Sequence, residues 1–112
     1  MEPQLVLHQI ILWDKADVTF KVTKNVFMLC RDVRRSGCAA LDICNVAAGR
    51  IDGFYEMELQ PWDYAAASII LEEAGGFITN WKGDKLSYLH KDSAIATNGH
   101  IHKELFEVIN RS

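Results

Sequence analysis

The segment EMELQPWDYAAASIILEEAGG, from Glu56 to Gly76, holds the residues best suited to chemistry. Asp63 follows Pro61 by two positions, and proline is typical of the first turn of a helix. The carboxylate of Asp63 would therefore lie near free backbone N–H groups and the positive end of the helix dipole, which favour its ionised form. Such a carboxylate can ligate Mg²⁺, together with phosphate and water oxygens. A purely structural role stays open, because acidic residues in the first turn commonly cap helices.

Two further carboxylates, Glu56 and Glu58, lie just before this helix. They fall on one side of residues 51–59, where apolar and acidic side chains alternate as in a strand. A carboxylate near the end of a strand often meets a ligand, but an exposed strand glutamate usually has no such role. Glu56 is therefore a candidate with a structural alternative, and Glu58 has less support.

Charge is unevenly distributed along the chain. Residues 21–35 are mainly basic, whereas Arg50 stands against six acidic residues in the stretch that follows: Asp52, Glu56, Glu58, Asp63, Glu72 and Glu73. These clusters are interpreted either as solvated faces or, for the acidic one, as a pocket for a hard cation.

Three other groups of residues resemble functional motifs, but a structural role is favoured for each. Asp52-Gly53 lies at the start of the predicted strand, where an acidic metal loop is not expected. His100 and His102 are two apart at the start of a predicted helix, so their side chains point in different directions. Cys38 has no histidine nearby in sequence and is interpreted as a small buried side chain rather than a nucleophile.

The composition predicts one soluble domain spanning residues 1–112. The chain is 49% hydrophobic and 24% charged, with a net charge of -3, which argues against a nucleic-acid binder held by phosphate contacts. Its three cysteines form no CxxC pair, so a disulfide framework or a cysteine zinc site is not expected. No apolar run approaches the roughly 20 residues that span a bilayer, and no signal peptide is recognised. We expect a cytoplasmic protein without a membrane partner.

Strands and helices alternate in the predicted secondary structure, which indicates an α/β layered architecture. Strands are expected at 5–13, 31–36, 51–59 and 94–97, and a hairpin joins 77–81 to 86–90. A buried helix is expected at 38–48, and another runs from Pro61 to Gly75-Gly76 with an apolar stripe formed by Trp62, Ala66, Ile69 and Ile70. An amphipathic helix follows Ile101, and residues 18–30 stay ambiguous, with Thr23 as the cap of a short helix.

Three segments in register resemble the C-terminal half of the inositol monophosphatase family: RRSGCAALD at 34–42, VAAGRIDG at 46–53, and Pro61-Trp62-Asp63 through Glu73-Ala74-Gly75-Gly76. The likeness covers roughly residues 31–80, continues more weakly to residue 112, and is loose over residues 1–30. It implies a layered mixed sheet with flanking helices and a Mg²⁺-dependent phosphomonoesterase, in which metal ions activate a water for in-line attack.

The resemblance also implies roles for individual residues. Asp63 matches the aspartate that ligates a metal ion, and Glu56 matches the glutamate that hydrogen-bonds a substrate hydroxyl. Gly37, Cys38 and Ala39 match a turn that touches the substrate through backbone groups and a Ser or Thr hydroxyl. Cys38 replaces that hydroxyl with a weaker hydrogen-bonding group, and Ala67 replaces a usual glycine.

The family's acidic pair and its Asp-Pro-(Ile/Leu)-Asp-Gly-Thr block have no match in this sequence. We therefore expect this chain, by itself, to be inactive. Joined to an N-terminal half, it would hydrolyse a small polyol or sugar phosphate. The alternative is a non-catalytic α/β module that binds a partner or forms a homodimer, because a sheet taken from a larger layered fold leaves an edge and a flank uncovered.

Overall fold

A five-stranded mixed sheet forms the centre of the computed structural model, which describes residues 4–7, 16–34 and 37–112. The strands are ordered β2-β1-β3-β5-β4. Their bounds are β1 Gln4–Leu7, β2 Asp32–Arg34, β3 Gly53–Leu59, β4 Phe77–Thr79 and β5 Asp92–Thr97. β1 pairs in parallel with β2 and β3, whereas β5 pairs antiparallel with β3 and β4.

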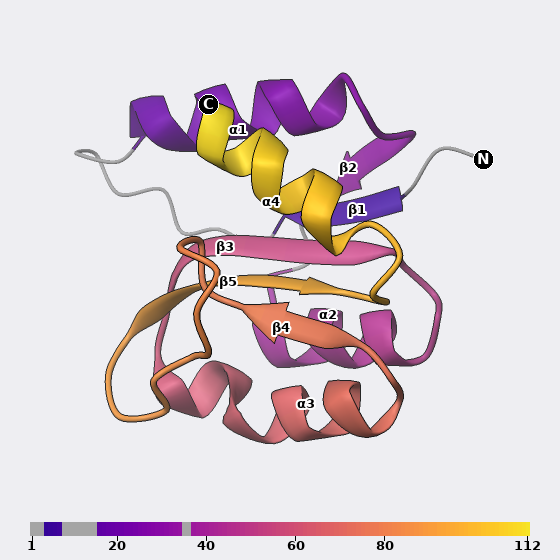
Figure 1. Cartoon of the computed structure of the whole chain (residues 1–112), viewed down its shortest axis with the longest axis vertical. Coiled ribbons are helices and arrows are strands. Elements are labelled where there is room, and N and C mark those ends of the chain that lie inside the picture. Colours follow the sequence, from indigo (N-terminus) through magenta and orange to yellow (C-terminus); the bar gives the residue numbers. More distant parts are fainter. Residues whose placement is uncertain (1–3, 8–15, 35–36) are drawn as a thin grey trace.

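Helices cover both faces of this sheet (Figure 1). One layer contains α1 (Ala16–Phe27) and α4 (His102–Arg111), and the other contains α2 (Ala39–Ala47) and α3 (Pro61–Glu73). The expected α/β fold with a layered mixed sheet and flanking helices is confirmed. Among the described residues, none of the helices combines the length and apolar character needed to cross a membrane.

The alternation of side chains along β3 divides the core in two. Phe54 packs in the cluster that contains Ile43, Tyr64 and Leu71 of α2 and α3. Its neighbour Tyr55 packs in the other cluster, with members of α1 and α4. Because successive strand residues face opposite sides, one strand supplies both layers of the core.

The N-terminal third differs in detail from the sequence-based expectation. The ambiguous segment 18–30 is helical as far as Phe27, as part of α1, and Thr23 lies inside this helix rather than at its start. β1 covers residues 5–7 of the strand expected at 5–13, and positions 8–13 lie outside the described residues. β2 lies within the strand expected at 31–36. Positions 35 and 36 of that expected strand are also outside the described residues.

The predicted hairpin between 77–81 and 86–90 is wrong. Residues 86–90 form no strand, and β4 pairs instead with β5, joining Ile78 to Ala96. Tyr88 adopts a positive φ of 62°, a conformation outside the extended region of a strand. Residues 86–90 instead belong to a loop in which Leu86 is buried and Leu89 is exposed.

The apolar stripe predicted on α3 exists, but it lies on the outer side of the helix. Trp62 is 78% exposed and Ile69 is 62% exposed. The side of α3 that packs on the sheet and α2 is made by four other residues: Tyr64, Ala67, Ser68 and Leu71. The helix is thus largely apolar on two sides.

Candidate functional site

The direction of the strands brings the predicted site residues to one edge of the sheet. β2 and β3 are both parallel to β1, so their carboxyl ends point to the same edge. α2 follows β2 and α3 follows β3, which places the N-terminal turns of both helices at that edge. In α/β sheets this edge is where ligands bind.

The register of the sheet makes this placement more specific. Arg34 of β2 and Phe54 of β3 both align with Val6 of β1, so β2 ends two residues before the level of Glu56. The chain then passes into α2 through Gly37, Cys38 and Ala39. Glu56 therefore lies beyond the level at which β2 ends, with the width of β1 between the two strands.

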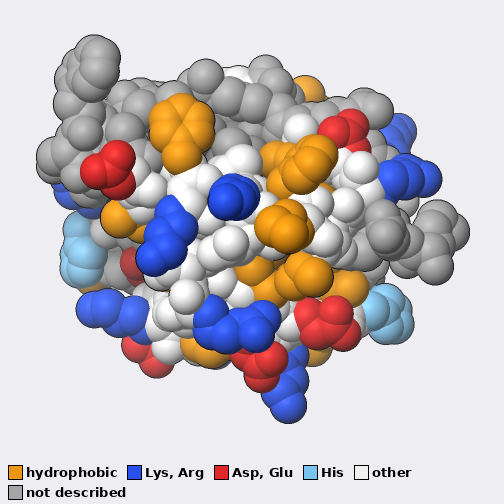
Figure 2. Space-filling view, turned by 90° about the horizontal axis from the view of Figure 1, so that it is seen from above, with side chains coloured by type: hydrophobic (Ala, Val, Ile, Leu, Met, Phe, Trp, Pro, Cys, Tyr) orange, Lys and Arg blue, Asp and Glu red, His pale blue; other side chains and the backbone are white. Residues whose placement is uncertain are grey.

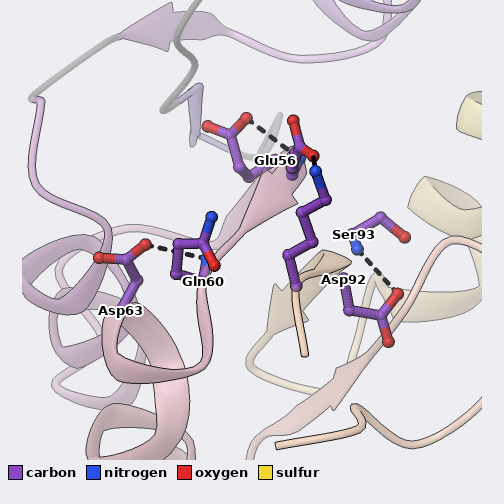
Figure 3. Close-up of polar contacts among 7 residues, drawn as sticks. Glu56, Gln60, Asp63, Asp92 and Ser93 are labelled. Atoms are coloured by element: carbon purple, nitrogen blue, oxygen red, sulfur yellow. Dashed lines mark hydrogen bonds and ion pairs between the residues drawn. The ribbon is translucent and has the colours of Figure 1, made fainter. Parts of the chain in front are cut away.

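Asp63 is held by the main chain that leads into its own helix. Its Oδ2 accepts the backbone N–H of Gln60 at 3.0 Å, and its own N–H donates to the Gln60 carbonyl at 2.9 Å (Figure 3). The side chain is partly exposed. The capping role predicted for Asp63 is thus present in the structure, and it fixes the orientation of the carboxylate at the edge of the sheet.

Glu56 lies on β3 with only 2% of its surface exposed. Its Oε1 accepts the backbone N–H groups of Met57 at 3.1 Å and Glu58 at 3.4 Å. Hydrogen bonds from N–H groups stabilise an ionised carboxylate. Figure 3 shows Glu56 and Asp63 on either side of the connection from β3 to α3, each held by its own segment.

The turn before α2 combines a glycine with positive φ and an N-cap residue with extended backbone angles. Gly37 has a φ of +88°, which a residue with a Cβ adopts only at a cost. Cys38 is the N-cap residue, with extended backbone angles and an exposed side chain, and it makes no side-chain cap hydrogen bond. The exposed thiol contradicts the interpretation of Cys38 as a buried side chain. Ala39, by contrast, is buried in the core beside α3.

A cation that the sequence analysis did not single out lies at the same edge. Lys91 Nζ forms an ion pair with Glu58 Oε1 at 2.7 Å, and this contact raises the pKa of Lys91. β5 runs antiparallel to β3 and pairs its first residue, Asp92, with Leu59. Lys91 is thereby brought to the carboxyl end of β3, a position visible only once the strand direction is known.

A second residue with no assigned role is Asp42, which is 2% exposed in the first turn of α2. A carboxylate at this position is stabilised by the positive end of the helix dipole. In the sequence, Asp42 is one of two polar residues in the otherwise apolar segment 38–48. The signal that could have revealed it is an acid on the buried side of that helix, where charged residues are rare.

The donors present do not complete a Mg²⁺ site. Within residues 4–7, 16–34 and 37–112, no group of three His, Cys, Asp or Glu side chains could hold a metal ion. Asp63 offers a carboxylate of the kind that Mg²⁺ prefers, but Mg²⁺ requires an octahedral set of oxygens. The structure therefore brings one candidate ligand, Asp63, to the edge of the sheet where the substrate-binding candidates also lie.

Two of the other motifs have structural roles in this fold. The carbonyl oxygen of Asp52 accepts the backbone N–H of Asn98 at 3.4 Å, which joins the start of β3 to the end of β5. His102 lies between two hydroxyls, with Nε2 at 2.9 Å from Thr79 Oγ1 and Nδ1 at 2.9 Å from Thr97 Oγ1. These contacts tie α4 to the sheet.

Comparison with known proteins gives relatives under two names. The chain is 48% identical over 77 residues to an inositol-1-monophosphatase of Bacillus subtilis, which covers 69% of this chain and 29% of the relative. It is 39% identical over 90 residues to the Nus factor SuhB of Escherichia coli, covering 80% of this chain and 33% of that protein.

Solved structures match almost the whole fold. An extragenic suppressor protein suhB of Bartonella henselae superposes with a TM-score of 0.89 at 34% identity, covering 99% of this chain and 43% of that one. The IMPase of Thermotoga maritima gives a TM-score of 0.84 at 33% identity, with 99% and 42% covered. The chain spans about a third of the length of the curated relatives it matches. A sequence profile of the inositol monophosphatase family matches residues 5–112, and the chain belongs to this family.

Proposed function

We propose that this chain forms the substrate-binding, C-terminal part of a Mg²⁺-dependent phosphomonoesterase. The observation that carries the proposal is the placement of Asp63, Glu56 and the Gly37 turn at one edge of the sheet in a member of the inositol monophosphatase family. The Bacillus subtilis relative is named as an inositol-1-monophosphatase, which supports phosphate-ester hydrolysis as the activity.

In this proposal Asp63 provides one metal-ligating carboxylate. The hydrogen bond from Gln60 to Oδ2 fixes the side chain, so the carboxylate faces the ligand without a change of rotamer. A bound Mg²⁺ would supply Lewis-acid chemistry and an activated water. Because the described residues do not complete a Mg²⁺ site, the remaining ligands must come from polypeptide outside this set.

The substrate is proposed to be a small polyol or sugar phosphate. A carboxylate such as Glu56 accepts hydrogen bonds from hydroxyl groups, and its own orientation is fixed by the N–H groups of Met57 and Glu58. Gly37 and Ala39 would contribute backbone contacts to the substrate. The Cys38 thiol is a weaker hydrogen-bonding group than a hydroxyl, which weakens selectivity for polyols at this turn.

Phosphate release from inositol 1-phosphate in the presence of Mg²⁺ tests this function. We expect no release from the chain by itself. Release is expected from a chimera in which this chain replaces the matching segment of the Bacillus subtilis relative. The same chimera with Asp63→Asn should lose the activity with only a small change in its melting temperature. A chimera that folds, binds Mg²⁺ and hydrolyses no phosphate ester would contradict the proposal.

A second candidate function is that of a non-catalytic module that forms a homodimer. The end of α1 and the turn after it expose apolar side chains, with Met28 at 72% and Leu29 at 58%. Figure 2, which looks onto the layer of α1 and α4, shows hydrophobic side chains gathered on this face. Sedimentation at micromolar concentration tests it: Leu29→Asp should shift a dimer to monomer, whereas Asp63→Asn should not. A monomeric parent chain would exclude this function.

A further inference from the structure

A cavity of about 370 Å³ lies between β4, the turn that follows it and the start of α4. It is far from the candidate site in the topology of the sheet. β5 runs antiparallel to β3, so the end of β5 and the start of α4 lie at the edge opposite to the one that holds Glu56 and Asp63 (Figure 1). The cavity is therefore a separate feature, hereafter the α4 cavity.

Three aromatic rings line the α4 cavity. Phe77 comes from β4, and His102 and Phe106 come from α4. The ring centroids of Phe77 and His102 lie 6.2 Å apart, with the ring planes inclined at 56°. Ring surfaces of this kind pack well against a flat aromatic molecule, either stacked or edge to face.

Two glycines let the phenylalanine rings lie directly against the main chain. A Cβ at Gly99 would come within 2.8 Å of Phe77 Cε2, and one at Gly83 would lie 3.4 Å from Phe106 Cε2. Both glycines belong to the lining of the cavity. The two rings are therefore supported by backbone, which favours walls that are already in place before a ligand binds.

The polar atoms of the His102 wall have partners within the protein. Nε2 lies 2.9 Å from Thr79 Oγ1, and Nδ1 lies 2.9 Å from Thr97 Oγ1, which also accepts the backbone N–H of Gly99 at 3.0 Å. Burial lowers the pKa of His102 below its ordinary value of 6.5, so the ring is neutral at pH 7. This wall therefore offers a ligand ring surface rather than a charge.

Lys103 supplies the positive charge of the cavity. It lies in the first turn of α4, its side chain is exposed, and it lines the cavity beside His102. Within residues 4–7, 16–34 and 37–112, Lys103 forms no ion pair. A single ammonium group next to apolar walls complements a single negative charge, such as that of a carboxylate.

The size of the cavity limits the ligand further. An apolar cavity of about 150 Å³ is large enough to hold benzene. A cavity of about 370 Å³ therefore has room for one or two fused rings with a substituent.

We propose that the α4 cavity binds a planar aromatic carboxylate. The flat ring system packs against Phe77, His102 and Phe106, and the carboxylate points toward Lys103. The proposal is independent of the phosphatase function, because none of its residues belongs to the candidate site.

Titration of this chain with 2-naphthoate, followed by amide chemical shifts in NMR, tests the proposal. We expect saturable shifts of the amides of Gly83, Gly99 and Lys103, whereas the amide of Leu29 on the other side of α4 stays unchanged. The neutral analogue 2-naphthamide has the same ring system and should bind more weakly. Absence of saturable shifts at the cavity, or equal affinity for the two compounds, would overturn the proposal.

A lysine variant tests the role of the charge. Lys103→Gln should weaken the binding of 2-naphthoate about fivefold, the range of a partly exposed ion pair, and leave the binding of 2-naphthamide unchanged. Lys21→Gln, which removes an exposed lysine of α1, should alter neither affinity. Equal effects of the two substitutions on 2-naphthoate would contradict the assignment of Lys103.

A phenylalanine variant tests the aromatic wall. Phe77→Leu should weaken the binding of both compounds, because the ring contacts do not depend on charge. Phe77 is 57% exposed, so its replacement should leave the fold intact, and the melting temperature checks this. Phe20→Leu, at a position of α1 that is 59% exposed, is the matched control. Unchanged affinities in Phe77→Leu would refute the site.

Two further measurements separate this proposal from the alternatives. Asp63→Asn should leave 2-naphthoate binding unchanged, with or without Mg²⁺, since the carboxylate lies at the other edge of the sheet. A loss of binding in this variant would place the ligand at the candidate site instead. Shifts of the Gly83 and Gly99 amides when the ligand-free chain is diluted would assign the cavity to contact between two copies, and would overturn the proposal.

Discussion

The hydroxyl of Tyr64 holds Tyr88 in a left-handed backbone conformation. It accepts the backbone N–H of Tyr88 at 3.2 Å and donates to the carbonyl of His90 at 3.2 Å. Among the residues that the structure describes, Tyr88 is the non-glycine residue with positive φ, 62°. The two rings lie 5.5 Å apart at 54°. Tyr64 follows Asp63, so the loop that leads to Lys91 is attached to the first turn of α3.

Tyr64→Phe should therefore destabilise the protein through the loop rather than through the core. The ring stays, but a buried hydroxyl with two partners is lost, which we expect to cost about 1–2 kcal/mol. Urea unfolding measures the change. Tyr88→Phe serves as the control, because its partly exposed hydroxyl bonds only Ser68 Oγ, at 3.0 Å, among the contacts described here. An equal loss in both variants would show that the Tyr64 hydroxyl does not anchor the loop.

Asp63→Ala should lower stability by about 1 kcal/mol, the typical cost of losing a side-chain cap at a helix start. The lost contact is the 3.0 Å hydrogen bond from the Gln60 N–H. Asp63→Asn should cost less, since an amide oxygen still accepts this bond. Denaturant midpoints measure both, with Glu72→Gln at an exposed position of the same helix as the reference. If Asp63→Ala unfolds at the midpoint of the parent chain, the capping role is wrong.

Tyr55 should make the protein lose stability in alkali. Burial raises its pKa to about 12, while the hydrogen bond to Thr23 Oγ1 at 3.1 Å opposes the shift and the nearby Cys30 and Glu56 add to it. The unfolded chain ionises near pH 10, so it releases the proton first. The contribution of Tyr55 to the free energy of unfolding is therefore fully present below pH 10. It falls as the pH rises toward 12, by on the order of 2–3 kcal/mol.

Unfolding by guanidinium between pH 9 and 12 checks this effect. Tyr55→Phe removes the ionisable group while keeping the ring in the core, and it should flatten the pH dependence. Tyr88→Phe removes a tyrosine hydroxyl outside this cluster and should leave the slope intact. Identical slopes for Tyr55→Phe and the parent chain would contradict the assignment.

His102 should make the protein less stable in mild acid. Burial lowers its pKa below the ordinary value of 6.5, so the unfolded chain takes up a proton at a higher pH than the folded one. The stabilisation is present above pH 6.5 and is lost as the pH falls through the folded pKa. Melting temperatures between pH 7.5 and pH 5 measure it. His102→Gln should reduce the dependence, whereas His100→Gln, at an exposed position, should not.

The parts of the fold that the sequence predicted well are those with a strong local pattern. The apolar run of α2, the alternation of β3 and the Pro61 start of α3 each determine their element within a few residues. The prediction failed for the partner of β4, because this strand pairs with residues that are distant in the sequence. A strand is expected at 86–90 from the sequence, but the positive φ of Tyr88 lies outside the extended region of a strand.

In the candidate site, too, residues marked by a local sequence pattern could be predicted, whereas those that depend on long-range pairing could not. Asp63 and Glu56 could be singled out because a helix start and a strand end are readable from neighbouring residues. Lys91 could not, because its pairing with Glu58 depends on β5 running antiparallel to β3. The exposure of Trp62 and Ile69 on α3 could not be predicted either, since an apolar helix position does not show which side of the helix faces the core.

The position of β1 in the sheet has a consequence for folding kinetics. β1 lies between β2 and β3, so the sheet closes only when the first residues of the chain meet residues beyond position 50. The pairing of β3 with β5 is similarly distant in sequence. Chains dominated by such non-local contacts fold slowly, because loop closure must precede the contacts that compensate it. The helices should therefore form first, and insertion of β1 should limit the rate.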